Sequence, residues 1–472
     1  MESEIQILND LFFRKNDYNL FFKKMIKIID NWIVNVKIIS NLKLDDIIIL
    51  QKFEQISSFK FEGVLELPGQ HLHMSTGALF YQFERLHAKI SRILPKIIKS
   101  NKKIYVAKKI KFQLNSGRII EGVVEQISQQ QIKSESRTLL FLRYLSTIMK
   151  SNTEARKRAI FSNYHIPLLV PLSNQYRLIM GNKSSATLDE ICSLHLKNKF
   201  KLNKIFNYYY KNVQTVNTNG ETNENDNNNK NNNNNNNMKM EMDTSTIKNN
   251  KELFLSIQKK YFPKTILRNF LISFLKNFDE YWDYIKLLTS NIASLSHLNY
   301  ILNNHFPLLE IMKIQLKDAH FSFVGARFSI ERKIQPKIVP FRLTSNFQKV
   351  ISNQNVFANY LSIISMPLAN EKNLFKLKGY LDLLIRDDIV SLATFNNTPS
   401  SNSQGISVDF SQFNDAVEKN VNLIISNIES ISPKIDNIKN NKCVNEKVYE
   451  LIEKATNIEN LIQFNPIFCA WF

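Results

Sequence analysis

Glycine is scarce in this sequence, with 10 residues in a chain of 472. Loops that bind phosphate through the backbone use several closely spaced glycines, so we do not expect a fold built on such a loop. The three cysteines, Cys192, Cys443 and Cys469, are too few and too scattered for a disulfide framework or a zinc site. This cysteine usage is typical of a reducing compartment.

Long apolar runs are also missing. No window reaches 18 apolar residues free of charge, so we expect no membrane span. The chain begins with Glu2 and Glu4 and has no apolar run before a cleavage site, so we expect no secretory signal. The sequence contains no Ser-His-Asp order, Walker-type loop or zinc-ligand spacing.

Positive charge is abundant, with a formal net charge of +20 and a pI near 9.5. Such a balance is typical of nucleic-acid-binding proteins. The densest basic clusters lie at residues 96–111 and 156–158, but the other basic residues are spread over many segments. No alternation with aromatic residues indicates a surface for stacking bases. We therefore expect a generally positive surface, and direct nucleic-acid binding only if the two clusters meet on one face.

A β-hairpin is predicted in the first third of the chain. Ile110, Phe112 and Leu114 alternate with polar side chains, which is the pattern of a half-buried strand. Residues 115–117, Asn-Ser-Gly, supply a tight turn, and residues 119–124 form the return strand.

Helical periodicity predicts several further elements. A serine precedes one of these helices as a start signal, and one helix has an apolar face near the end of the chain. The predicted helices cover residues 1–58, 138–150 (with Ser136 at the start), 263–276, 280–303 and a final short helix with Val448, Leu451, Ile452 and Ala455 on one face.

Residues 214–250 differ in kind from the rest. The run from Asn227 to Asn237 is almost wholly asparagine and cannot bury apolar surface to offset the entropy of ordering. We expect a disordered insertion there, with order returning at Phe254. A second loop, rich in serine and asparagine, is predicted over residues 396–406.

Short motifs in a shared order and spacing resemble one family. Residues 64–70 (VLELPGQ) resemble the start of its small lobe, residues 166–173 (IPLLVPLS) its interlobe connector, and residues 339–344 (VPFRLT) the motif after its activation segment. Residues 440–472 resemble a FATC segment, which ends on an apolar tail. The chain thus resembles the C-terminal pseudokinase and FATC region of the phosphatidylinositol 3-kinase-related kinase family, in its transformation/transcription-associated (TRRAP) branch.

The resemblance implies an α+β, two-lobed protein/lipid-kinase-like fold, with a small β-containing lobe and a large, mostly helical lobe. The implied domains are a helical lead-in at 1–60, the small lobe at 61–172, the large lobe at 173–430 with the disordered insertion 214–250, and the FATC segment with its helix at 440–472.

The residues that transfer phosphate are expected to be absent. Active relatives use a lysine to pair with the phosphates, and aspartate and asparagine to hold magnesium. The resemblance places Glu125 at the lysine position and Ser322 at the magnesium-binding aspartate, and residues 303–309 (NNHFPLL) of the expected catalytic loop contain no aspartate. We therefore expect no enzyme activity, no catalytic or metal-binding residues, no cofactor and no small-molecule substrate.

The resemblance implies a scaffold in transcription regulation, located in the nucleus, whose partners are protein subunits of histone acetyltransferase complexes such as SAGA. Trp471 and Phe472 are the candidate interaction residues, and the competing interpretation packs both rings against the large lobe near the helix that precedes His305. Two other functions stay open: an active protein or lipid kinase of the same family with displaced catalytic residues, and a basic nucleic-acid-binding protein.

Three further groups could carry chemistry, and each has a simpler interpretation. His305 and Asp318 could act as base or metal ligand near the expected catalytic loop, but solvated loop residues are expected. His71 and His73 have no third ligand nearby in sequence, which favours a surface loop. Residues 386–388, Arg-Asp-Asp, are expected to be structural on a large-lobe helix.

Overall fold

The computed structural model comprises two compact units. One unit, called here the sheet unit, holds residues 1–132 and 167–183, and the other, the helical unit, holds residues 133–166 and 184–472. The described residues are 47–49, 88–94, 96–100, 106–152, 169–171, 176–181, 185–196, 204–209, 244–275, 277–303, 309, 312–316, 319, 321–323, 328, 339–396, 410–432, 446–464 and 468–472.

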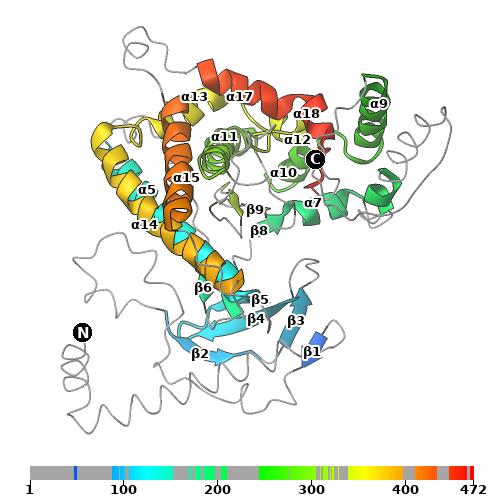
Figure 1. Ribbon diagram of the computed structural model, residues 1–472. Coiled ribbons are helices and arrows are strands. Elements are labelled where there is room, and N and C mark those ends of the chain that lie inside the picture. The colour runs from blue at the N-terminus through cyan, green and yellow to red at the C-terminus, as the bar shows by residue number, and fades with distance from the viewer. Residues whose placement is uncertain are drawn as a thin grey trace, which may run out of the picture. The chain divides into compact units, whose positions relative to one another are not determined.

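An antiparallel sheet forms the sheet unit (Figure 1). Its strands follow the order β1-β3-β4-β5-β7-β6, and β2 pairs with the same edge of β4 as β3 does, farther along the strand. The strands are β1 (Ile47–Ile49), β2 (Ile90–Ile93), β3 (Lys96–Ser100), β4 (Val106–Leu114), β5 (Ile119–Gln126), β6 (Leu169–Pro171) and β7 (Tyr176–Gly181).

The predicted hairpin is confirmed in strands β4 and β5, which pair from Val106↔Gln126 to Gln113↔Ile119. Gly117 in its turn has φ +77°, a conformation that favours glycine.

Gly122 of β5 is needed for a different reason. A Cβ there would lie 2.8 Å from Leu178 Cδ1 and 2.9 Å from Phe112 Cε2. A side chain at this position would therefore displace the core.

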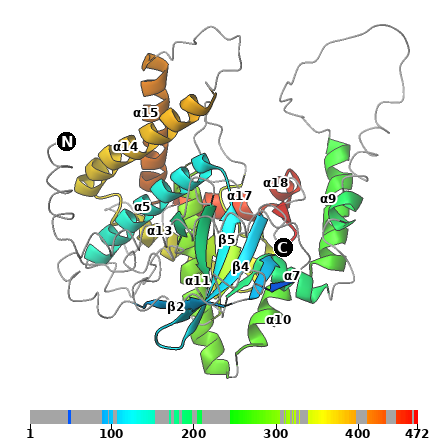
Figure 2. The same cartoon turned by 90° about the horizontal axis from the view of Figure 1, so that it is seen from below.

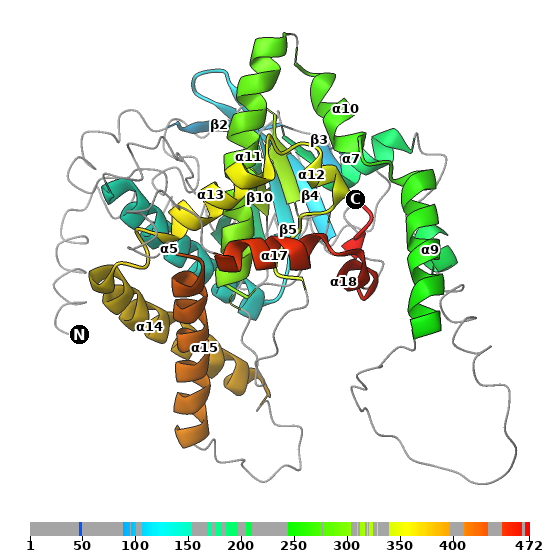
Figure 3. The same ribbon diagram turned by 90° about the horizontal axis from the view of Figure 1, so that it is seen from above.

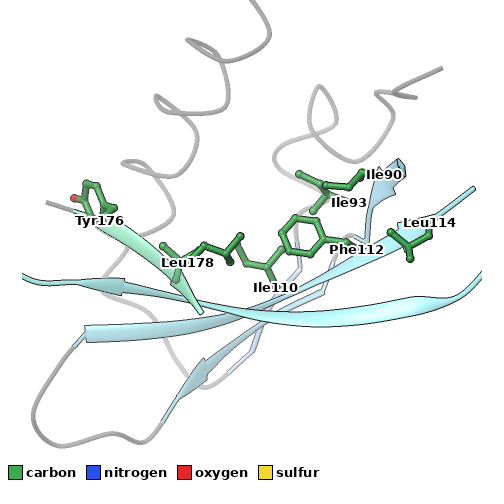
Figure 4. Close-up of a cluster of buried hydrophobic side chains, with 8 residues drawn as sticks. Ile90, Ile93, Ile110, Phe112, Leu114, Tyr176 and Leu178 are labelled. Atoms are coloured by element: carbon green, nitrogen blue, oxygen red, sulfur yellow. The ribbon is translucent and has the colours of Figure 1, made fainter. Parts of the chain in front are cut away.

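The core of the sheet unit lies on one face of these strands (Figure 4). The predicted inward set of Ile110, Phe112 and Leu114 is buried, as the two-residue alternation requires. The cluster consists of Ile90, Ile93, Ile110, Phe112, Leu114, Val124, Tyr176 and Leu178.

The predicted helical lead-in is wrong where the structure describes it. Residues Ile47–Ile49 form β1 and pair with Ile98, Ile97 and Lys96 of β3. Three consecutive β-branched side chains fit a strand better than a helix. The remainder of residues 1–60 lies outside the described residues.

The predicted helix at residues 138–150 is part of the longer helix α5 (Gln129–Ser151). The Oγ of Ser128 accepts a hydrogen bond from the backbone N–H of Gln131 at 3.3 Å. This is an N-cap contact, so Ser128 starts the helix and the expected start at Ser136 is wrong.

The other helices of the helical unit are arranged around α11 (Figures 2 and 3). Helix α11 packs against α13 and α15, α14 packs along α15, and α13 contacts α17. A small antiparallel sheet has the order β10-β9-β8. The elements are β8 (Ser185–Thr187), α7 (Leu188–His195), α9 (Thr244–Tyr261), α10 (Ile266–Ile272), α11 (Phe278–Ile301), β9 (Met312–Gln315), β10 (Phe321–Phe323), α12 (Ser345–Gln348), α13 (Gln354–Ser365), α14 (Glu371–Asn396), α15 (Phe410–Ile431), α17 (Glu446–Thr456) and α18 (Ile458–Ile462).

Helix α11 confirms the predicted buried helix, since nearly every side chain from Leu288 to Ile301 is buried. Helix α10 ends at Ile272, before the predicted end at 276. Helix α17 also confirms its prediction, because its predicted apolar face is buried. None of the helices in the described part of the chain is long and apolar enough to cross a membrane.

The predicted insertion is too long at its C-terminal end. Helix α9 begins at Thr244, so residues 244–250 are helical rather than disordered, and Asn250 is buried. The buried residues Phe254 and Ile257 hold the helix, and adding residues to an existing helix is easier than starting a new one. Residues 214–243 lie outside the described residues, as do residues 397–406 of the second predicted loop.

Candidate functional site

The position predicted for the phosphate-binding lysine holds a buried ion pair. Glu125 in β5 and Arg177 in β7 are direct partners across the two neighbouring strands. Arg177 donates from Nε and Nη2 to Glu125 Oε2 at 3.0 and 2.7 Å. The exposed fractions of the two side chains are 0% for Glu125 and 2% for Arg177.

This geometry explains how the sheet tolerates two charges in its interior. Two charged groups removed from water are tolerated when they pair closely and share hydrogen bonds. Both guanidinium donors converge on one carboxylate oxygen, which fixes the orientation of both side chains. A carboxylate carries a negative charge, the opposite of the charge that pairs with a phosphate group.

Among the other predicted catalytic positions, the structure describes Ser322 in the helical unit. Ser322 is the middle residue of β10, and its backbone pairs with Lys313 of β9. The catalytic-loop candidate His305 lies outside the described residues, as does Asp318. In the described ranges no group of three His, Cys, Asp or Glu side chains could hold a metal ion.

The three remaining sets of predicted residues have different outcomes. His71 and His73 lie outside the described residues, and so does the basic cluster at 156–158. Asp388 on α14 is buried, pairs with Arg137 of α5 and accepts a hydrogen bond from Ser134 Oγ at 2.9 Å. Arg137 also pairs with Asp387. These contacts join α5 to α14, as expected for structural carboxylates.

The last residues of the chain occupy a buried site, called here the C-terminal seat. Arg342 donates from Nη1 to the carbonyl of Cys469 at 3.3 Å and from Nη2 to the carbonyl of Phe468. Thr344 Oγ1 donates to the backbone carbonyl of Phe472. Both donors belong to the motif at residues 339–344, which therefore binds the tail.

Aromatic rings enclose Trp471 in the seat. Its indole lies with ring centroids 5.2 to 6.2 Å from four other rings, in stacked and edge-on arrangements that are favourable for aromatic pairs. Gln258 Nε2 of α9 donates to the Trp471 carbonyl at 3.3 Å. The four rings are Phe206, Tyr209, Phe254 and Phe262.

Both candidate interaction residues are buried in the seat, with exposed fractions of 1% for Trp471 and 0% for Phe472. The predicted location of these rings near the helix before His305 is wrong for Trp471. Its ring neighbours come from residues 206–209, from α9 and from Phe262 just after α9.

Burial sets the protonation states in the seat. Desolvation lowers the pKa of Arg342 to about 10, so its guanidinium still carries a charge at neutral pH. Desolvation also raises the pKa of Cys469 to about 12 and that of Cys192 well above its usual value. These two cysteines are therefore neutral thiols and poor nucleophiles.

Curated proteins with similar sequences carry the name Tra1 or the name transformation/transcription domain-associated protein. The Schizosaccharomyces pombe "SAGA complex/NuA4 acetyltransferase complex subunit Tra1" is 27% identical over 89% of the chain. The human "Transformation/transcription domain-associated protein" is 22% identical over 90% of the chain, and the Saccharomyces cerevisiae subunit TRA1 is 24% identical over 88%. The chain is a relative of the Tra1/TRRAP proteins. None of the family models matches the sequence.

This Tra1/TRRAP relative spans only about a tenth of the proteins it matches: 11% of the S. pombe protein, 10% of the human protein and 11% of the S. cerevisiae protein. Solved structures of similar fold include "FAT and kinase domain of CtTel1", with a TM-score of 0.57 and 16% identity, covering 82% of this chain and 24% of that one. "Structure of the open conformation of CtTel1" has a TM-score of 0.63 and 15% identity, covering 92% and 14%. The predicted α+β kinase-like fold class is confirmed.

Sequence reasoning missed most residues that build the two buried sites of this Tra1/TRRAP relative. Arg342 lies inside the motif at residues 339–344, which was used only for the resemblance. The alternation of β5 and β7 could have indicated that Glu125 and Arg177 share a strand face, since neighbouring strands bring same-face residues together. No sequence signal indicates the seat, because its parts are separated by more than 100 residues.

Proposed function

We propose that this chain is a catalytically inactive, kinase-like scaffold, and that it is part of or related to a Tra1/TRRAP-type subunit of acetyltransferase complexes that act on histones. The names of its relatives support membership of such a complex, because the two yeast relatives are SAGA/NuA4 subunits. The proposal includes a location in the nucleus and a role in transcription regulation.

The buried pair of Glu125 and Arg177 supports the absence of catalysis most directly. A kinase needs a cation that reaches the nucleotide phosphates, because the transferred group carries several negative charges. Glu125 has the wrong charge for that task, and Arg177 is already hydrogen-bonded to it inside the sheet. Ser322 at the expected magnesium position has a neutral hydroxyl, which is a poor ligand for this ion.

Magnesium-ATP binding tests this part of the proposal. We expect calorimetry and thermal shift of the full chain to show no magnesium-dependent ATP binding. An active kinase of the same family, measured in parallel, would show that the assay detects such binding. A micromolar affinity that requires magnesium would contradict the proposal and favour an active kinase.

Partner capture tests the scaffold role. We expect the tagged full chain, purified from its own cells, to bring along subunits of an acetyltransferase complex. We propose that Trp471 and Phe472 contribute to this assembly by holding the seat in shape. A Trp471→Leu variant should then lose these subunits, whereas Trp282→Leu, which changes an exposed tryptophan of α11, should retain them. Capture without any such subunit would argue against the complex.

A further inference from the structure

Helix α14 has apolar side chains on two opposite sides. One side is buried in the helical unit and includes Leu377, Leu381 and Ile385. At about 100° per residue, the other side carries Phe375, Leu383 and Val390, whose exposed fractions are 83%, 65% and 44%. A helix that is apolar on both sides is usually covered on both. We call the second side, with these three residues and Gly379, the outer face of α14.

Gly379 makes a notch in the outer face. It lies one helical turn from Phe375 and one turn from Leu383, so two large apolar side chains flank it. A Cβ built on Gly379 meets no atom within 4 Å, which means that open space lies above the helix backbone at this point. Such a hole between neighbouring side chains can accept an apolar side chain from a second helix.

The charges around Phe375 are mostly positive. Lys372, Lys376 and Lys378 are exposed, and in the described part of the chain none of the three forms an ion pair. Glu371 is the acidic residue beside them, and Asp382 farther along is paired with Arg386 at 3.3 Å. A partner with acidic residues on both sides of an apolar stripe would match this pattern.

We propose that the outer face of α14 docks an acidic, amphipathic helix of a protein partner, with one large apolar side chain in the notch at Gly379. The chemistry combines an apolar contact with Phe375 and Leu383 and ion pairs with the unpaired lysines. This helix-in-groove mode uses apolar anchors at helical spacing.

Two other occupants fit less well. A second copy of this chain carries a net charge of +20 and would bring the same lysines to the same place. One helix face with three large side chains is also small beside the roughly 1,200 Å² that stable protein interfaces bury. A nucleic acid would match the lysines and stack on Phe375, but it would leave the aliphatic side chains of Leu383 and Val390 without an apolar contact.

A synthetic peptide tests the proposal. The probe is a fluorescein-labelled helix of about 20 residues, a length at which isolated helices become stable, with leucines on one face and glutamates on the other. We expect its fluorescence anisotropy to rise on titration with the full chain and the affinity to fall as salt is added. The same peptide with lysine in place of glutamate should not bind.

The decisive variant is Gly379→Leu, which fills the notch. Leucine favours a helix more than glycine does and has room at this position, so the fold should be retained. We expect binding to weaken by at least about tenfold, as for loss of an anchor contact. The control Leu194→Gln changes an exposed leucine of α7 and should leave binding unchanged.

Several results would overturn the proposal. These are equal binding of the acidic peptide to the original chain and to Gly379→Leu, equal binding of the lysine peptide, or no binding of the acidic peptide. Sedimentation velocity would also overturn it by showing a dimer that Gly379→Leu dissociates, because the occupant would then be a second copy.

Discussion

The sheet unit and the helical unit each bury an arginine, and they satisfy it in different ways. Arg177 pairs with the carboxylate of Glu125, its direct partner on the neighbouring strand. Arg342 instead donates to the backbone carbonyls of Phe468 and Cys469 near the end of the chain. The first arrangement neutralises charge within one sheet, whereas the second uses charge to hold a distant segment in place.

This difference predicts different consequences of mutation. Losing a partner in the sheet leaves an uncompensated buried charge. Losing Trp471 and Phe472 from the seat removes apolar packing, whereas the carbonyls of Phe468 and Cys469 that accept from Arg342 stay in the chain. The four experiments below compare the units in order of decreasing expected effect.

Removing the tail should have the largest effect. Deleting Ala470 to Phe472 takes two buried rings out of the seat, and each such ring costs about 3–5 kcal/mol when it is lost from a core. We expect the free energy of unfolding of the helical unit to fall by at least about 5 kcal/mol, measured by urea denaturation. Trp282→Ala, at an exposed position of α11, is the control and should change it by less than about 0.5 kcal/mol. A truncated protein that unfolds normally would show that the seat is not a stabilising element.

Breaking the pair in the sheet should have a smaller effect that can be rescued. Glu125→Leu leaves Arg177 buried without this carboxylate, and we expect a loss of about 3–5 kcal/mol in urea denaturation. The double variant Glu125→Leu with Arg177→Met removes both charges and should recover most of that loss, because an apolar pair of similar size can replace a buried ion pair. If the double variant is as unstable as the single one, the pair is not an isolated charge–charge contact.

A buried histidine of the helical unit should make its stability depend on pH. His297 of α11 shares a hydrogen bond with Ser365 Oγ at 2.7 Å, and burial lowers its pKa from 6.5 to about 3. The unfolded chain therefore takes up a proton between pH 6.5 and 3 that the folded chain does not. The stabilising contribution is complete above pH 6.5 and is lost as the pH falls toward 3, by up to about 1.4 kcal/mol per pH unit.

The variant His297→Gln isolates this effect. The slope of unfolding free energy against pH below 6.5 should become shallower in His297→Gln than in the original chain. Equal slopes in the original chain and His297→Gln would mean that His297 does not stay neutral in the fold.

Shortening the asparagine-rich segment should have the smallest effect. Helix α9 begins at Thr244, so deletion of residues 215–243 leaves its described part intact. The entropy of closing a loop changes by only about 0.6 kcal/mol for each doubling of its length. We expect thermal unfolding to show nearly the same melting temperature, and a loss of many degrees would show that the segment packs on the fold.

Local patterns were enough to predict the hairpin of β4 and β5, helix α11 and the apolar face of α17. In each case the period of apolar residues already matches the surface that is buried. The wrong predictions concern segments whose secondary structure depends on contacts with other residues in the fold. Strand β1 needs β3 as a partner, and the first residues of α9 extend a helix anchored by later residues.

Sequence patterns alone established the two-residue alternation of the sheet, the buried central helix and the resemblance to the Tra1/TRRAP proteins. Contacts in the folded chain were needed to show that Glu125 pairs with Arg177, that residues 339–344 bind the end of the chain, and that Trp471 lies among four rings. The physical reason is separation along the chain. Periodicity reports which side of an element is buried, but the partner that covers that side comes from 52 residues away in the sheet and from 128 residues away in the seat.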